Sequence, residues 1–234
     1  MGFTCVIVKE FYIKELELKY FVGISQIKIE LNQFLELNKL DNEEEALNHL
    51  FKMIQALQNK NSESTIQIIK DDYVLNQDHI FVACYYQQKA LFHDTLISNK
   101  KSIELLLYLS THRQIGKGIK LFGLNSDDLK KGKFITCFIS PIDNLKSILN
   151  DILELLRAHE IGITINDLTL DKITEIIKIY ELSELQIKSV LNSYGIKNIN
   201  LIKPKNNLHN ISIAVFDLIC EKMALLNLEK INLE

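Results

Sequence analysis

The stretch from Ser98 to Leu124, SNKKSIELLLYLSTHRQIGKGIKLFGL, contains an apolar run, a helix start and a basic helix in direct succession. Its first part, Ile103 to Leu109, is apolar except for one glutamate, and is bounded by Lys-Lys before it and Ser-Thr after it. A run of this length favours a buried strand, although periodicity alone leaves a buried helix open. We therefore expect an internal element of the fold here.

A helix is predicted to begin at Thr111. Thr111 and Gln114 form the T-x-x-Q pattern, in which each side chain caps a backbone N–H near the other. Gly123 stands where a helix commonly ends. Residues at helical spacing between these limits are expected to face the core: Ile115, Ile119 and Phe122.

Basic residues recur in the same segment about two residues out of phase, as a stripe that is expected to face outward: Arg113, Lys117 and Lys120. A cation in the first turn, such as Arg113, opposes the helix macrodipole and is unfavourable by a few tenths of a kcal/mol. With a bound phosphate the contribution of this cation would become favourable, because free backbone N–H groups and basic side chains would both face the phosphate. The simpler interpretation is the solvated face of an amphipathic helix.

Charge is unevenly distributed along the 234 residues, whose formal net charge is −3. The segment from Tyr85 to Lys133 contains nine Lys or Arg and four Asp or Glu, a local charge of +5. The negative net charge of the whole chain argues against a generally basic nucleic-acid-binding protein. The positive charge of this segment favours a local basic surface. Hydrophobic and charged fractions of 47% and 24% indicate an ordinary globular chain.

The whole sequence predicts an α/β fold in a single domain over residues 1–234. Phe3 to Val8 is expected to be an internal strand, whereas the segment from Lys9 to Leu40 fits helix and strand alike and stays open. We expect a mixed sheet of about four to five strands flanked by helices, with a helical carboxy-terminal part. Further strands are predicted at 65–69 and 134–139, a polar turn at 125–133, and helices at 41–57, 76–96, 143–157, 171–182 and 210–228. Asp41 is expected to cap the first of these helices, and either Asn76 or Asp78 to open the second.

Motifs for catalysis or metal binding are missing from the sequence. The G-K-G at 116–118 lacks the rest of a phosphate loop, the six histidines show no zinc spacing, and there is no nucleophile elbow. We therefore expect no enzyme activity, no cofactor and no metal. The absence of a leader and of a long apolar run predicts a cytoplasmic protein without membrane contact. Its cysteines lie far apart and are expected to be reduced and buried: Cys5, Cys84, Cys137 and Cys220.

The central stretch resembles the PRPK-binding-protein family, the accessory subunit of the KEOPS complex. The family pattern E-x-L-L-Y-L-[ST]-x-x-R-Q-I-x-x-A-I-x-x-x-G is similar to the sequence from Glu104 to Gly123, where Gly118 takes the place of the usual alanine. The resemblance covers most of Phe3 to Leu228. It is loose at 9–40 and at 184–210, where a family-atypical helical insertion is expected.

This resemblance implies a noncatalytic subunit of the archaeal-type assembly that installs threonylcarbamoyl on the tRNA adenosine beside the anticodon. In that family the subunit captures tRNA, particularly its unpaired CCA end. Six basic residues are expected to contact tRNA: Arg113, Lys117, Lys120, Lys89, Lys100 and Lys101. An unpaired base also needs a plane to stack on, and four residues are open candidates: Tyr85, Tyr86, His112 and Arg113.

The last helix is apolar over most of its circumference, which suggests a second surface. In the resembling family this end docks on the amino-terminal lobe of the kinase-like ATPase subunit of the complex. Five residues are expected to dock: Ile213, Phe216, Ile219, Cys220 and Met223. Alternatively, the segment 184–210 covers the second apolar stripe of this helix, which is formed by Ile213, Phe216, Cys220 and Ala224. The competing function is a protein-only adaptor or allosteric activator of a kinase-like partner, without direct tRNA contact.

Overall fold

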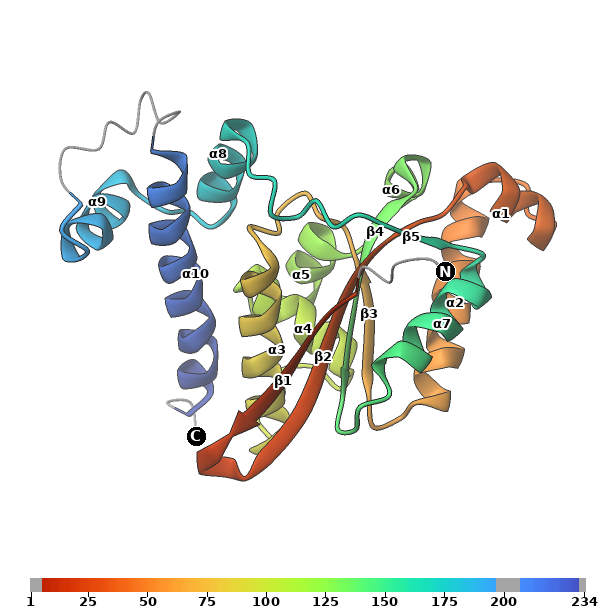
Figure 1. Ribbon diagram of the computed structural model, residues 1–234, viewed down its shortest axis with the longest axis horizontal. Coiled ribbons are helices and arrows are strands. Elements are labelled where there is room, and N and C mark those ends of the chain that lie inside the picture. The colour runs from red at the N-terminus through yellow and green to blue at the C-terminus, as the bar shows by residue number, and fades with distance from the viewer. Residues whose placement is uncertain (1–5, 197–206, 232–234) are drawn as a thin grey trace. The chain divides into compact units, whose positions relative to one another are not determined.

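The computed structural model describes residues 6–196 and 207–231, with side chains in the last helix described as far as Leu226 (Figure 1). The chain divides into two compact units. Unit 1 comprises residues 1–71 and 123–164, and unit 2 comprises residues 72–122 and 165–234. Each unit is described by itself, and the single-domain organisation stays a prediction.

Unit 1 is built on a sheet. Within the described residues five strands pair in the order β1-β2-β4-β3, with β5 also on β2: β1 (Ile7–Ile13), β2 (Leu18–Lys28), β3 (Thr65–Ile69), β4 (Lys133–Ser140) and β5 (His159–Ile161). The helices of unit 1 are η1 (Lys14–Leu16), α1 (Leu31–Asn38), α2 (Glu43–Lys60), α6 (Ser126–Lys131) and α7 (Leu145–Leu156). The α/β class and the predicted number of strands are confirmed, but the strand pairings in this part of the chain are all antiparallel rather than mixed.

The core of unit 1 lies between one face of the sheet and helices α2 and α7, which pack side by side (Figure 1). Leu50 of α2 and Ile148 of α7 are buried there against Phe138 of β4. Helix α2 begins after Asn42, whose side chain accepts a hydrogen bond from the backbone N–H of Glu45 at 2.9 Å. The prediction placed this cap one residue earlier, and such a shift is ordinary for helix ends.

Two local predictions in unit 1 need correction, and the structure resolves one segment that the sequence left open. The first strand begins at Ile7 and lies at an edge of the sheet, not inside it; residues 3–5 of the predicted strand lie outside the described residues. The ambiguous segment 9–40 contains the end of β1, then β2 and α1. The polar turn at 125–133 contains α6, because Asn125 and Asp128 form a reciprocal capping box that stabilises a short helix.

Unit 2 is helical in its described residues: α3 (Gln77–Phe92), α4 (Lys101–Ser110), α5 (Ile115–Phe122), α8 (Leu170–Ile179), α9 (Glu184–Ser193) and α10 (Leu208–Ile231). Helix α3 packs against α4 and α10, α5 packs against α4, and α9 packs against α10 (Figure 1). Of the two predicted starts of α3, Asn76 and not Asp78 is the cap: its side chain accepts a hydrogen bond from the backbone N–H of His79 at 2.9 Å.

The apolar run from Ile103 to Leu109 is a helix and not the predicted strand. It forms most of α4, in which every residue from Glu104 to Ser110 is buried. A helix that is enclosed by its neighbours is apolar on all sides, and its sequence then looks like that of a buried strand. The alternative that periodicity left open is therefore correct.

Candidate functional site

The junction between α4 and α5 differs from the predicted capping box. Thr111 ends α4 in the left-handed conformation, with φ of 54°, and its backbone N–H donates to the carbonyl of Tyr108 at 3.1 Å. Helix α5 begins only at Ile115, and the carbonyl of Gln114 accepts hydrogen bonds from the N–H groups of Lys117 and Gly118. Thr111 therefore belongs to the end of one helix rather than to the start of the next.

The exposed face of α5 carries both basic and apolar residues. Lys117 and Lys120 are exposed, in line with the predicted outward stripe. Ile115 and Ile119 are 44% and 43% exposed, so the prediction that they face the core is wrong. Phe122 does face the core, as predicted.

Close packing of α5 on α4 explains this orientation. Gly118 is buried, and a Cβ atom at this position would lie 3.2 Å from Leu107 Cδ2 and 3.3 Å from the carbonyl oxygen of Leu106. Because Gly118 lets the two helices approach closely, it takes the inward position together with Phe122. The two isoleucines are thereby turned to the outside of the helix.

Arg113 does not lie in the first turn of α5, so the dipole argument for a phosphate beside it does not apply. Its side chain is half-buried, and Nη1 donates to the carbonyl oxygen of Leu226 on α10 at 2.9 Å. The guanidinium group thus joins the α4–α5 connection to the last helix. It retains further N–H donors, since a guanidinium carries five.

His112 lies in a basic environment next to this contact. Partial burial and the positive charges of Lys117 and Lys222 lower its pKa, while Glu181 opposes that shift. Lys222 stands one helical turn before Leu226 on α10 and was not among the predicted residues. Sequence reasoning missed it because only the fold brings residue 222 close to residue 112.

The remaining predicted basic residues lie on α3 and at the start of α4. Lys89 Nζ lies 5.6 Å from the centre of the Tyr85 ring, a cation–π contact. Lys100 is exposed just before α4, and Lys101 is half-buried at its first position. Two lysines at a helix start oppose the macrodipole, and an anion would stabilise this arrangement.

The tyrosines proposed as stacking planes are partly occupied within unit 2. The rings of Tyr85 and Tyr86 meet edge to face at 5.3 Å, and Tyr86 stacks on the buried Tyr108 at 6.0 Å. Burial is the main cause that raises the pKa of Tyr86. Both Tyr85 and Tyr86 keep half-exposed side chains, so each still presents part of its surface.

The last helix separates the five predicted docking residues into two groups. Ile219 and Met223 are fully buried, so they belong to the core and are removed from the predicted docking surface. Ile213, Phe216 and Cys220 are half-buried on the second apolar stripe. Helix α9, which belongs to the segment 184–210, packs on α10 and covers part of it.

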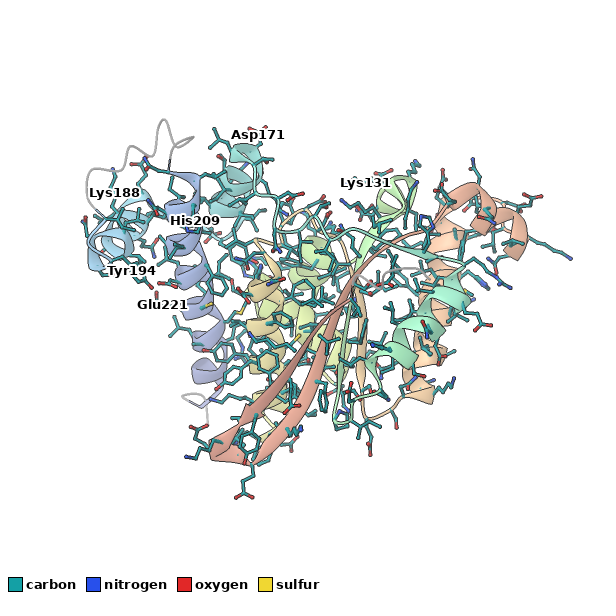
Figure 2. The ribbon with its side chains drawn as sticks, viewed as in Figure 1. Lys131, Asp171, Lys188, Tyr194, His209 and Glu221 are labelled. Carbon is teal, nitrogen blue, oxygen red and sulfur yellow. The ribbon has the colours of Figure 1, made fainter. Side chains whose placement is uncertain are left out.

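Tyr194, directly after α9, contributes to this cover. Its hydroxyl donates to Asp217 Oδ2 of α10 at 2.6 Å, and Figure 2 shows Tyr194 beside that helix. Proline 204 and most of the polar connection around it lie outside the described residues, so the structure says nothing of their part in the cover.

A cavity of about 700 Å³ opens beside the amino-terminal half of α10. Ile213 and Phe216 line its apolar part, whereas Asn76, Asp78 and Asn166 supply polar groups. Apolar surface with a few hydrogen-bonding groups suits an inserted side chain of a partner. Two of the predicted docking residues therefore share one concave surface.

The described residues contain no cluster of three or more His, Cys, Asp or Glu side chains that could hold a metal ion. Cys84 and Cys137 are buried, as predicted, and Cys5 lies outside the described residues. Cys220 is half-buried, and burial, with Asp217 and Asp78, raises its pKa to about 12. Across residues 6–196 and 207–231, no helix combines the length and the apolar character needed to cross a membrane.

Comparison with known proteins identifies the family. Among curated proteins no match was found. One protein-family model matches residues 40–227, which include the α4–α5 region and all of α10 that has described side chains, and its description is kinase binding protein CGI-121. Since the match covers most of the sequence, the chain belongs to the family of kinase binding protein CGI-121.

Proposed function

We propose that this chain is a noncatalytic, cytoplasmic subunit of the KEOPS complex, which makes threonylcarbamoyladenosine in tRNA. In this role it binds tRNA, especially the 3' CCA end, and docks on the kinase-like ATPase subunit. Membership of a kinase-binding family supports the second activity. The exposed lysines of α5, next to His112 and Lys222, support the first.

The basic surface of unit 2 carries the tRNA proposal. Lys117 and Lys120 are exposed on one short helix, and Lys222 adds a positive charge from α10 near His112. Lysines so placed can neutralise neighbouring phosphates and release the counterions condensed on them. The half-exposed Tyr85, with Lys89 over its ring, offers a plane on which an unpaired base can stack.

The concave surface beside α10 carries the docking proposal. Phe216 is half-buried in the wall of the cavity, so an incoming side chain would bury the rest of its ring. Aromatic residues in such desolvated pockets commonly supply much of the binding energy of an interface. We therefore narrow the docking surface to Ile213 and Phe216, which line the cavity, and to Cys220, which is half-buried on the same helix.

Reversal of charge on α5 tests the tRNA activity. The double variant Lys117→Glu/Lys120→Glu is expected to lose at least tenfold in affinity for tRNA, because two attractive phosphate contacts become repulsive. Its binding to the kinase-like subunit should be unchanged. The matched control is Lys178→Glu/Lys188→Glu, which alters two exposed lysines of α8 and α9. Equal tRNA affinities for both double variants would refute the assignment of the basic face.

The protein-only adaptor is the second candidate, and the exposed isoleucines of α5 favour it. Ile115 and Ile119 present apolar surface beside the lysines, and Leu225 of α10 is 46% exposed. Apolar patches of this kind are more typical of protein interfaces than of phosphate-binding surfaces. Under this alternative, Ile115→Glu would abolish kinase binding and the purified chain would not bind tRNA.

A further inference from the structure

The segment from Ile97 to Lys101 leads into α4 and carries two of the basic residues of the proposed tRNA surface. Ser98 is buried, whereas Lys100 is exposed and Lys101 is half-buried. The segment has no regular structure before Lys101, where the helix begins. Something other than a helix or a strand must therefore fix the positions from which the two lysines extend.

Glu104, one turn into α4, supplies the main contacts. It is fully buried, and its Oε2 atom accepts hydrogen bonds from the backbone N–H groups of Ile97 at 3.0 Å and Ser98 at 2.8 Å. An acidic residue in a first turn usually caps its own helix, whereas this one reaches back to the preceding segment. Without it, two N–H groups would lose their acceptor, which is costly where they are shielded from water.

Gln87 on α3 holds the same segment from the other end. Its Nε2 atom donates to the carbonyl oxygen of Lys101 at 2.8 Å, and Gln87 is itself fully buried. The hydroxyl of Ser98 also accepts the backbone N–H of Lys100 at 3.2 Å. All these bonds act on backbone atoms and not on the ammonium groups of the lysines.

We propose that Glu104, assisted by Gln87, is a positioning residue for tRNA binding: it fixes the Ile97–Lys101 backbone so that Lys100 and Lys101 meet the phosphates together. This inference rests on the proposed tRNA-binding function. Glu104 itself touches no phosphate. Its effect is to remove the loss of backbone freedom that a loose segment would suffer on binding.

The test is a mutant cycle on the full chain, with a tRNA that carries an intact CCA end as the probe. Affinity is measured by fluorescence anisotropy over a series of salt concentrations. In the wild type, Lys100→Ala/Lys101→Ala should reduce the slope of log affinity against log salt by about 1.4, two contacts at roughly 0.7 each. In a Glu104→Ala background the same pair should reduce it by less than half as much. Glu104→Gln keeps an oxygen acceptor in place and should restore the full effect.

Two further measurements separate positioning from general stability. Hydrogen exchange at the amides of Ile97 and Ser98 should accelerate in Glu104→Ala. Asp128→Ala removes another buried capping carboxyl, in α6, and should leave the effect of the two lysines unchanged. Gln87→Met keeps the shape but loses the bond to Lys101, so it provides a second route should the alanine variant fail to fold.

The possible outcomes distinguish a failure of the positioning role of Glu104 from a failure of the proposed tRNA binding. Equal effects of the lysine pair with and without Glu104, or with Gln87→Met, would overturn the positioning role while tRNA binding stands. No effect of the lysine pair in a wild-type chain that binds tRNA would do the same, because there would be nothing to position. A wild-type chain that binds no tRNA would overturn the proposed function itself.

Discussion

His79 makes the stability of unit 2 depend on pH. The side chain is fully buried in α3, where Nδ1 accepts the backbone N–H of Leu75 at 3.2 Å and Nε2 lies 3.2 Å from the carbonyl oxygen of Leu109. The hydroxyl of Tyr180 donates to the same carbonyl and lies 3.2 Å from Nε2. A ring whose Nδ1 accepts a hydrogen bond must be neutral, with its proton on Nε2.

Burial therefore lowers the pKa of His79 from 6.5 to about 4, with a smaller contribution from Lys172 and an opposing one from the Leu109 carbonyl. In the unfolded chain His79 is protonated near pH 6.5, whereas in the folded chain it is protonated only near pH 4. The stability due to the neutral ring is complete above pH 6.5 and is lost as the pH falls toward 4. Between pH 7.5 and 5.0 the loss is about 2 kcal/mol.

Urea unfolding, followed by the near-UV circular dichroism of the tyrosines, measures this loss at several pH values. The variant His79→Gln should be less stable at pH 7.5 but should lose about 2 kcal/mol less than the wild type on acidification to pH 5.0. His93→Gln, at the exposed end of α3, is the control and should behave like the wild type. Parallel losses in the wild type and His79→Gln would refute the reasoning, as would an NMR signal of His79 that titrates near pH 6.5.

Three other changes give distinct expected results. Gly118→Val should lower the free energy of unfolding by about 1–3 kcal/mol, because the new Cβ meets α4. In the same urea titration the control Gly116→Val should cause no such loss, because no atom lies within 4 Å of a Cβ at that position. Asn76→Ala removes the cap of α3 and should cost about 1 kcal/mol by the same measurement; an unchanged midpoint would contradict that role. Phe216→Glu should weaken binding to the kinase-like ATPase about tenfold or more in calorimetry, while Leu185→Glu, on the exposed face of α9, should not weaken it. Equal affinities of the two variants would refute the docking surface.

The sequence predicted elements well where local signals are strong. The β-branched run at Thr65 to Ile69 is β3 with the predicted bounds, and Asn76 starts α3 as its capping side chain suggested. The failure at Ile103 to Leu109 has a physical cause. Enclosure of α4 on all sides removes the polar positions that reveal helical periodicity, so strand and helix give the same pattern.

The candidate site was predictable only in part, for a similar reason. Exposure of Lys117 and Lys120 followed from their spacing, but the inward turn of Gly118 depends on how closely α5 approaches α4, which no local signal reports. The bond of Arg113 to the carbonyl of Leu226 joins residues more than a hundred positions apart. Contacts of this kind, including the proximity of Lys222 to His112, arise from the fold and not from the local sequence.

Whether this member of a kinase-binding family also captures tRNA is decided by the affinity of the purified chain for tRNA. One tRNA is compared with and without its terminal CCA, over a series of salt concentrations. We expect tight binding that requires the CCA end and falls steeply with salt, since lysine–phosphate contacts supply it. Equal and negligible binding of both forms would contradict the account and leave α10, with its docking surface, as the functional part of the molecule.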